Sequence, residues 1–531
     1  MSNTNSQDKV AEVTANYAAI TPEAKRHSRE SGNLEIPNCW TSAKLTDIAI
    51  LNMGQSPSSS DVNTNGTGIV FFQGKAEFGK LYPTPKKYCT APKKIAESGD
   101  ILLSIRAPVG PTNLANQKTA IGRGLAAIKA TPSLTDPKFL LHYFRALEPW
   151  LSQQGTGTTF KAVSGQFLKE ITATLPPLAE QKVIADKLDE LLAQVDTLKT
   201  RLDAIPAILK RFRQSVLAAA VSGKLTEEWR DNKHSFTTKE LIKKLDAERR
   251  EVLEQEISQG NKETARLLKK IKSHSPKLPD ETLPTNWEWT TFMQAMERVV
   301  DCHNKTAPYE NDGIPLIRTP DIRDGKISLD GARYISQKTY EYWSRRCPPE
   351  QGDIIFTREA PMGEAGIVPK GVTLCMGQRM MLLRPMPKFV NPEYTLLNIQ
   401  SVQFQERMLK QAIGTGVKHL RVADVEALVF PLAPLAEQTE IVRRVDQLFA
   451  YADQIEQQVK NAQARVNQLT QSILAKAFRG ELTAQWREEN PELISGENSA
   501  EALLERIKAE RAAATTKKTR TKKPATRKTK A

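Results

Sequence analysis

An internal repeat limits the folds open to this chain of 531 residues more than any other property of its sequence. The segment PLAEQ that begins at Pro177 returns at Pro434, which is 257 residues later (434 minus 177). A chain that writes one sequence twice is expected to build one structural unit twice, so we expect two similar modules. Three further matches keep the same offset without a gap: Ser215 with Ser472, Gly223 with Gly480, and Trp229 with Trp486.

The repeat extends toward the start of each module, with small insertions. Between the matching positions the two copies differ freely. Each module therefore consists of a variable domain followed by a well-matched segment, and the chain is long enough for two such domains. The matches in the variable part are Ile36 with Leu283, Trp40 with Trp287, Gly99 with Gly352, and Ala107 with Ala360.

Each well-matched segment has the pattern of a long coiled-coil helix. Its apolar residues alternate spacings of three and four, which indicates a seam with a period of 3.5 residues. Pro177 and Pro434 suit a first helical turn, and Gly223 and Gly480 suit a left-handed stop. A helix between them would be roughly 50 Å long at about 1.5 Å per residue. The seam residues are Ile184, Leu188, Leu191, Val195, Leu198, Leu202, Ile205, Leu209, Phe212 and Val216 in the first copy, and Ile441, Val445, Leu448, Ala452, Ile455, Val459, Ala462, Val466, Leu469 and Ile473 in the second.

Pro206 is the residue that breaks the symmetry of the two helices. It lies inside the first helix, where a proline removes a backbone hydrogen bond and clashes with the preceding turn. Gln463 occupies the matching position in the second helix. The sequence therefore predicts a kink near Ile205 and a straighter second helix.

The order of the parts has a geometric consequence. If the two helices pair antiparallel, the variable domains lie at opposite ends of one rod and are related by a pseudo-twofold axis. Duplex DNA has the same symmetry, and roughly 50 Å corresponds to between one and two turns of about 34–36 Å. Both domains could then read one duplex with unread base pairs between them.

Composition agrees with a polyanionic partner. The net charge is +15 and the isoelectric point is about 9.4. Lysine and arginine that neutralise phosphates release condensed counterions, so such a charge favours nucleic acid. Part of the charge lies in residues 515–531, a basic tail that we expect to be disordered and either to hold DNA or only to keep the chain soluble.

Other classes of protein are disfavoured. No apolar run approaches the roughly 20 residues that span a bilayer, and the first residues lack the apolar stretch of a secretory signal, so we expect a cytoplasmic protein without a membrane partner. The cysteines form no C-x-x-C pair, which argues against a disulfide framework and a zinc site, and no metal is expected. The five are Cys39, Cys89, Cys302, Cys347 and Cys375.

No motif predicts catalysis by this chain. The segment NPEY at Asn391 resembles a methyltransferase tetrad, but Asp136 begins DPKF at the corresponding place, and both fit a helix N-cap followed by proline. Asp353 loosely resembles a nuclease carboxylate, yet Gly-Asp before an apolar strand is an ordinary turn. No phosphate-binding loop of the G-x-x-x-x-G-K-[ST] form and no nucleophile with its base is present.

The repeated motifs resemble those of the specificity subunits of type I restriction-modification enzymes. The resemblance covers about residues 36–511 and rests on PPLAEQ (176–181), ILKRFRQSVL (208–217), SGKLTEEWR (222–230) and their second copies. It implies two target-recognition domains, each reading one half of a split DNA site. It also implies two modification subunits that bind S-adenosylmethionine and methylate adenine, and restriction subunits that use ATP and magnesium. This chain itself would hold no cofactor.

The fold expected is α+β: two target-recognition domains with small sheets, joined by two long helices that form an antiparallel coiled coil. The expected parts are a polar extension (1–35), the first target-recognition domain (36–176), the first coiled-coil helix (177–222), a charged helical linker (223–282), the second target-recognition domain (283–433), the second coiled-coil helix (434–480), a helical extension (481–514) and the basic tail (515–531).

Residues that contact DNA should be polar or basic and lie on loops of the variable domains. The candidates are Gln55, Ser56, Ser58, Gln73, Lys75, Arg106, Arg123, Thr158 and Lys161 in the first domain, and Asn304, Lys305, Arg318, Thr319, Arg358, Arg379, Thr415 and Lys418 in the second. A role in a subunit interface or as a helix cap is expected for Glu180, Gln181, Glu437 and Gln438 at the helix starts.

Two interpretations compete with a DNA reader. One is a coiled-coil scaffold that never touches DNA, and the other is a free-standing DNA methyltransferase.

A further alternative concerns residues 237–272, where LIKKLDAER (241–249) resembles LLERIKAER (503–511). These stretches are either duplicated extra helices that bear on the subunit interfaces or solvated charged helices. The two unlike variable domains predict a target that is not palindromic, whose bases the sequence does not specify.

Overall fold

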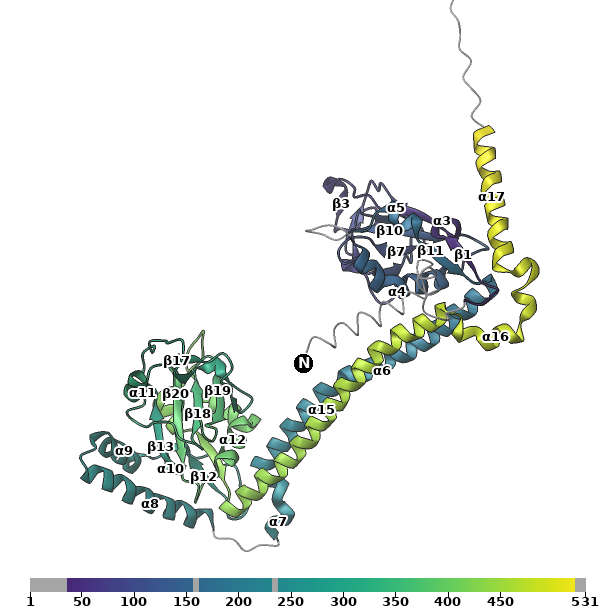
Figure 1. Cartoon of the computed structure of the whole chain (residues 1–531). Helices are drawn as coiled ribbons and strands as arrows, with labels where there is room; N and C mark the ends of the chain where they lie inside the picture. The colour runs from purple at the N-terminus through teal and green to yellow at the C-terminus, as the bar shows by residue number, and fades with distance from the viewer. Residues whose placement is uncertain (1–35, 156–161, 232–236, 521–531) are drawn as a thin grey trace, which may run out of the picture. The chain divides into compact units, whose positions relative to one another are not determined.

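The computed structural model describes residues 36–155, 162–231 and 237–520 (Figure 1). The chain divides into two compact units, which we call unit 1 (1–203 with 461–531) and unit 2 (204–460). Each unit contains one variable domain, part of each long helix and one of the duplicated extensions. The α+β class with small sheets and long helices is confirmed.

The variable domain of unit 1 is built from two main sheets. The first is antiparallel, in the order β2 (Ala49–Met53), β10 (Leu125–Ala130), β7 (Ile101–Ser104) and β8 (Thr112–Leu114). The second has the order β3 (Val62–Asn63), β5 (Tyr88–Cys89), β4 (Ile69–Phe72), β9 (Thr119–Ile121) and β6 (Ile95–Ala96), and in it β4 and β9 are parallel. A two-stranded sheet of β1 (Thr41–Lys44) and β11 (Thr172–Leu175) closes the domain next to the long helix.

Strand β7 of the first sheet is buried on both faces, which explains its apolar run. Successive side chains of a strand point to opposite faces. In β7, Ile101 and Leu103 join the core that includes α4 (Pro137–Gln154), whereas Leu102 joins the core beneath the second sheet. The continuous run ILL therefore serves two cores, and alternation of polar and apolar residues is absent because neither face meets water.

Unit 2 repeats this architecture. Its antiparallel sheet has the order β13 (Met296–Asp301), β21 (Met380–Pro385), β18 (Ile354–Arg358) and β19 (Met362–Ile367). Its second sheet has the order β17 (Arg333–Ile335), β14 (Ile314–Ile317) and β20 (Cys375–Met376), with β14 and β20 parallel. The strands β12 (Glu288–Thr291) and β22 (Val429–Leu432) pair as β1 and β11 do. A helix α11 (Gln337–Trp343) lies within the inserted residues of this copy.

The two long helices are α6 (Leu178–Val221) and α15 (Leu435–Phe478), with 44 residues each. Pro177 and Pro434 immediately precede them, and their carbonyl oxygens accept hydrogen bonds from the N–H groups of Gln181 and Gln438, respectively. Each helix is followed by a glycine in the left-handed region, Gly223 at φ 73° and Gly480 at φ 79°, which confirms the predicted stops. Helix α6 continues through Pro206, and the kink there stays a prediction.

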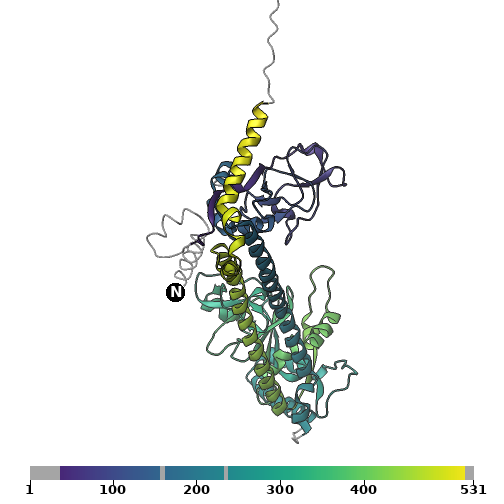
Figure 2. The same cartoon turned by 90° about the vertical axis from the view of Figure 1, so that its right-hand side faces the viewer.

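Segments of the two long helices pack together inside each unit and run in opposite directions (Figures 1 and 2). In unit 1, Lys187 donates to the carbonyl of Leu482 at 2.9 Å, and Gln463 donates to Asp203 at 2.7 Å. In unit 2, Arg213 pairs with Asp453 at 2.6 Å. Most seam residues are buried or half-buried there, but Leu198 and Leu469 are 46% and 43% exposed.

The duplicated extensions are helices that cover the variable domains. Helix α8 (Thr238–Ser258) contacts α10 (Phe292–Ala295), and α17 (Ala500–Arg520) contacts β1 and α3 (Leu45–Ile48). Leu245 on α8 and Leu503, Leu504 and Ile507 on α17 are buried. These helices are therefore not solvated on all sides. Helix α17 continues to Arg520, inside the stretch predicted to be disordered, and the rest of that tail lies outside the described residues.

The buried Arg249 fixes α8 to its domain. Its Nη1 donates to the carbonyls of Met293 at 2.7 Å and Met296 at 3.0 Å, and its Nη2 pairs with Asp246 at 2.7 Å.

Among the helices of the described residues, none combines the length and the apolar character needed to cross a membrane.

The NPEY and DPKF segments are helix starts, as predicted. Asn391 is the N-cap of α12 (Pro392–Gln400), and its side chain accepts from the N–H of Tyr394. Asp136 is the N-cap of α4 and accepts from the N–H groups of Lys138 and Phe139. Both are followed by proline at the first helical position.

This arrangement predicts the effects of two substitutions. Asn391→Ala is expected to lower the free energy of unfolding by about 1 kcal/mol because one N–H of the first turn loses its partner. Asn391→Asp should leave stability within about 0.5 kcal/mol, since aspartate caps as well as asparagine does. Denaturant unfolding of the two variants measures both values. Equal losses would contradict the capping role.

Candidate nucleic-acid interface

A buried carboxylate stands at the start of each long helix. Glu180 has no exposed surface and accepts three short hydrogen bonds, from Trp40 Nε1 at 2.7 Å, Thr483 Oγ1 at 2.6 Å and Arg487 Nη1 at 2.6 Å. Trp40 belongs to the first variable domain, whereas Thr483 and Arg487 follow the second long helix. The Cys39 thiol lies 3.9 Å from the Glu180 carboxylate. Burial is the main cause that raises the pKa of this thiol, and the negative charge of Glu180 raises it further.

Unit 2 contains the same network with the copies exchanged. Glu437 accepts from Trp287 Nε1 at 2.8 Å, Thr226 Oγ1 at 2.7 Å and Arg230 Nε at 3.2 Å. Trp287 belongs to the second variable domain, and Thr226 and Arg230 follow the first long helix. SGKLTEEWR (222–230) and its second copy (479–487) are therefore each bound at the start of the other copy's long helix, so each unit needs residues from both modules.

The adjacent glutamines tie the helices to the variable domains. Gln181 Oε1 accepts from the N–H of Asp136 at 2.8 Å, and its Nε2 donates to the carbonyls of Leu134 and Pro176. Gln438 makes the same bonds to Asn391, Phe389 and Ala433. All four side chains thus bond inside their own unit and are buried, rather than capping their own helix or facing another subunit. The repeat of Trp, Thr and Arg at matched positions was the signal for this network.

Loops of the first variable domain gather several of the predicted DNA-binding residues. Ser56 and Gln73 are hydrogen-bonded side chain to side chain at 2.9 Å, and the N–H of Arg123 donates to Ser56 Oγ at 3.3 Å. Gln55 precedes this cluster and is exposed, as are Arg106 and the side chain of Arg123. Arg106 follows Ile105, whose N–H donates to the Gly124 carbonyl at 2.9 Å. The structure therefore brings these five residues to one group of loops.

The second variable domain has a hollow of about 240 Å³ in the corresponding place. The predicted residues that line it are Lys305, Arg318, Thr319 and Arg379. Gln378 and two aromatic side chains, Trp343 and Tyr309, also line it. His303 lies against the Trp343 ring, with ring centroids 4.6 Å apart. Burial is the main cause that lowers the pKa of His303, and the positive charge of Arg345 lowers it further.

Other predicted residues are placed differently. Thr319 is almost buried and donates to the Ala360 carbonyl at 2.8 Å, and Arg358 bonds to the Leu420 carbonyl at 3.2 Å and pairs with Asp301 at 3.4 Å. These two side chains support loops. Lys75 lines another hollow, beside α6 and α15 in unit 1. Ser58, Asn304, Thr415 and Lys418 are exposed, whereas Thr158 and Lys161 lie outside the described residues.

Backbone hydrogen bonds define which loop positions correspond. The N–H of Ile105 donates to Gly124, and the N–H of Arg358 donates to Arg379, both at 2.9 Å. The N–H of Gly122 donates to the Phe72 carbonyl, and the N–H of Gly377 donates to the Ile317 carbonyl in the same way. The N–H of Gly54 donates to the Leu125 carbonyl, and the N–H of Cys302 donates to the Met380 carbonyl. The sequence match of Ala107 with Ala360 already places Arg106 opposite Glu359, and these backbone hydrogen bonds agree with it. Glu359 was not among the predicted residues, whereas its neighbour Arg358 was. The corresponding pairs are Gln55 with His303, Ser56 with Asn304, Gln73 with Arg318, Arg106 with Glu359, and Arg123 with Gln378.

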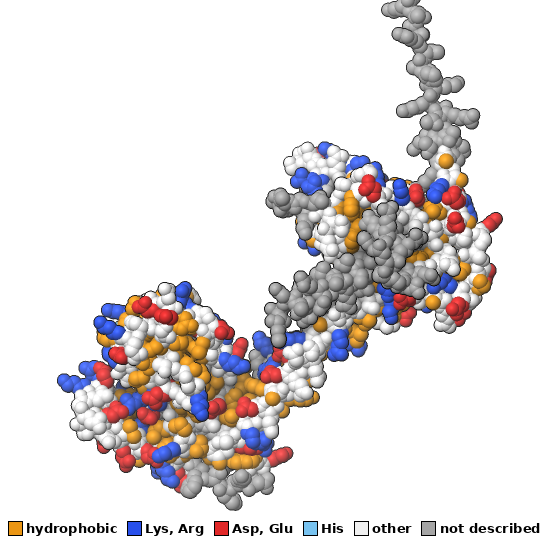
Figure 3. Space-filling model, in the orientation of Figure 1, with side chains coloured by type: hydrophobic (Ala, Val, Ile, Leu, Met, Phe, Trp, Pro, Cys, Tyr) orange, Lys and Arg blue, Asp and Glu red, His pale blue; other side chains and the backbone are white. Residues whose placement is uncertain are grey.

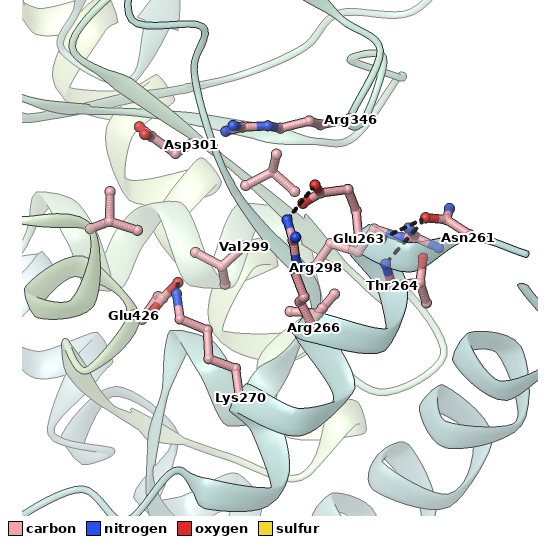
Figure 4. A pocket seen from close by; sticks show the side chains of 13 residues that line it. Asn261, Glu263, Thr264, Arg266, Lys270, Arg298, Val299, Asp301, Arg346 and Glu426 are labelled. Atoms are coloured by element: carbon pink, nitrogen blue, oxygen red, sulfur yellow. Dashed lines mark hydrogen bonds and ion pairs between the residues drawn. The ribbon is translucent and has the colours of Figure 1, made fainter. Parts of the chain in front are cut away.

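Charge alone does not mark the site. On the face seen in Figure 3, basic and acidic side chains are interspersed over each unit. A hollow of about 380 Å³ between α9 (Lys262–Ser273) and β13 shows the same mixture (Figure 4). There Lys270 pairs with Glu426 and Arg298 pairs with Glu256, so much of its charge is neutralised within the chain. In residues 36–155, 162–231 and 237–520, no three His, Cys, Asp or Glu side chains are grouped to hold a metal.

Comparison with known proteins decides the family. The family of the type I restriction modification DNA specificity domain matches residues 37–207 and 300–463. The EcoBI specificity subunit of Escherichia coli is 36% identical over 503 residues, which cover 93% of this chain and 97% of that protein. The chain belongs to the type I restriction-modification DNA specificity family.

Further relatives agree with this membership. The EcoKI specificity subunit of Escherichia coli K12 is 40% identical over 380 residues, covering 70% of this chain and 71% of that protein. The crystal structure of the HsdS subunit from Thermoanaerobacter tengcongensis aligns with a TM-score of 0.52 at 20% identity, covering 84% of this chain and 98% of that one. That likeness supports the fold. Each of the two stretches that match the specificity family combines part of a variable domain with part of a long helix, so the family unit occurs twice here.

Proposed function

We propose that this specificity-family chain reads a bipartite, non-palindromic DNA site and directs adenine methylation or cleavage by partner subunits. One observation carries the proposal: two domains of one fold present chemically unlike side chains at corresponding loop positions. Base identity is read by side chains that match the donors and acceptors of base edges, so different sets read different bases.

The long helices are proposed to form one antiparallel coiled coil that sets the spacing of the two domains. The opposed direction of the helix segments in each unit supports this role, as does the hydrogen bond between Asp203 and Gln463 near the middle of both helices. The buried networks at Glu180 and Glu437 support it further, because they join each variable domain to the end of the opposite helix.

The chain is proposed to act without chemistry of its own, in the cytoplasm, as part of a complex. Two modification subunits would bind S-adenosylmethionine, and restriction subunits would use ATP and magnesium. The structural roles of Asn391 and Asp353 support the absence of catalysis: Asn391 caps α12, and Asp353 accepts from the N–H of Glu350 and pairs with Arg384. A scaffold without DNA contact is less suitable, since it has no need for paired domains with unlike loops.

A salt titration of DNA binding tests this function. The chain is assembled with its modification subunits and assayed by mobility shift on DNA recovered by binding selection. We expect sequence-specific binding whose log affinity falls linearly with log salt, with a slope of about −0.9 for each phosphate neutralised. Absent binding, or binding that neither prefers a sequence nor depends on salt, would refute the proposal.

A further inference from the structure

We propose that the loop position held by Arg106 in the first variable domain and by Glu359 in the second reads one base of each half-site, with Glu359 accepting a hydrogen bond from the amino group of cytosine. The inference rests on the proposed function and deepens it, since it names a specificity-determining residue in each domain.

The two residues occupy one structural position. Arg106 lies just beyond β7, and Glu359 lies just beyond β18, the corresponding strand of the second domain. Arg106 forms an isolated bridge with Ala162, and Glu359 forms the corresponding bridge with His419. The preceding residues confirm the match, because the N–H of Val163 donates to Ile105 and that of Leu420 donates to Arg358, both at 3.0 Å. The backbone of the site is thus common to both domains, and only the side chain differs.

The position adjoins the other loops that converge in each domain. Glu359 lies next to Arg379, with Nε and Oε2 3.5 Å apart, and Arg379 lines the hollow that contains Gln378 and Arg318. In the first domain, Gly124 is joined to Ile105 and directly follows Arg123 of the loop cluster. Arg106 and Glu359 therefore stand beside the side chains most suited to base contact.

The sign of the charge separates a base contact from a phosphate contact. A carboxylate is repelled by phosphates, so Glu359 in a DNA-facing loop cannot be an anchoring contact. Glutamate can accept from cytosine N4, whereas arginine donates in bidentate fashion to guanine O6 and N7. The ion pair with Arg379 is largely exposed, with side chains 32% and 53% exposed, so it contributes little to stability. It leaves the carboxylate held in place with acceptor capacity to spare.

Selection and sequencing of bound DNA tests the assignment in the chain assembled with its modification subunits. Glu359→Gln removes the charge at nearly constant shape, and a glutamine can pair with adenine N6 and N7. We expect the preference to move from cytosine toward adenine at one position of the second domain's half-site, by about tenfold to a hundredfold. The other half-site and the salt slope should not change. Glu341→Gln on α11 makes the same charge change at an exposed residue and should leave the selected site unchanged.

A reciprocal variant guards against a folding defect in the second domain. Arg106→Gln should weaken the preference for guanine at one position of the first domain's half-site. The half-site of the second domain should not change. An unchanged site in both variants overturns the inference while leaving the proposed function intact, provided the unaltered chain selects a bipartite site. Uniform weakening on all sequences also overturns it, because that is the signature of phosphate contacts. An unaltered chain that selects no sequence ends both proposals.

Discussion

Replacing Glu180 by alanine is expected to destabilise unit 1 by about 3–5 kcal/mol, because it removes the buried acceptor that the Trp40 indole, the Thr483 hydroxyl and the half-buried Arg487 guanidinium share. The carboxylate has no exposed surface, and its donors are Trp40, Thr483 and Arg487. Denaturant unfolding measures the loss, and hydrogen exchange in β1 and β11 assigns it to unit 1. Glu437→Ala should produce a similar loss in unit 2, read out from β12 and β22.

Two controls make this prediction specific. Glu190→Ala removes a carboxylate from an exposed position on the same helix and should change stability by no more than about 0.5 kcal/mol. Glu180→Gln keeps one acceptor and removes the charge, so an intermediate loss is expected. If Glu180→Ala unfolds no more easily than Glu190→Ala, the network does not hold the variable domain to the helices.

Gly480→Ala is expected to cost about 2–5 kcal/mol. Part of this is the roughly 1–2 kcal/mol of a side chain in the left-handed region, and part is the roughly 1–3 kcal/mol of overpacking. A Cβ at Gly480 would lie 2.5 Å from Pro37 Cγ and 3.0 Å from Arg487 Nη1. The added methyl would therefore push the start of the first domain away from the Glu180 network.

Gly496 is the matched control for this substitution. It also has a positive φ, of 57°, but nothing lies within 4 Å of a Cβ built there. Gly496→Ala should show only the conformational part of the loss, so the difference between the variants isolates the contact with Pro37. In unit 2, Gly223→Ala and Gly260→Ala form the same pair, since Gly223 faces Pro284 and Gly260 faces open space. Equal losses within each pair would contradict the packing argument.

Local patterns in the sequence were sufficient for the repeat, the long helices and their ends. Proline before a first turn, glycine after a last turn and an N-cap before proline act through the nearest few residues, and so Gly223, Gly480 and Asn391 could be placed without tertiary information. The apolar period of the helices is equally local. Leu198 and Leu469 belong to that period, and their exposure was not predictable from it.

The candidate site depended much more on the fold. Glu180 and Glu437 looked like capping or interface residues because a carboxylate near a helix start usually binds backbone N–H groups or solvent. Their partners are at least 140 residues away in sequence, at separations of 140, 303 and 307 for Glu180. No pattern of spacing records such contacts. Glu359 was missed for a different reason: the match of Ala107 with Ala360 places it opposite Arg106, but the candidates were chosen among polar uncharged and basic side chains.

By itself, the sequence determined that this protein has two copies of one module, each a variable domain with a long helix, because repetition and short-range helix signals are written along the chain. The tertiary structure alone decided that SGKLTEEWR (222–230) and its second copy (479–487) each bind at the start of the opposite long helix, and which loop side chains converge in each domain. Buried hydrogen bonds and strand register join residues that are distant in the chain, and their energies depend on burial and geometry that arise only after folding.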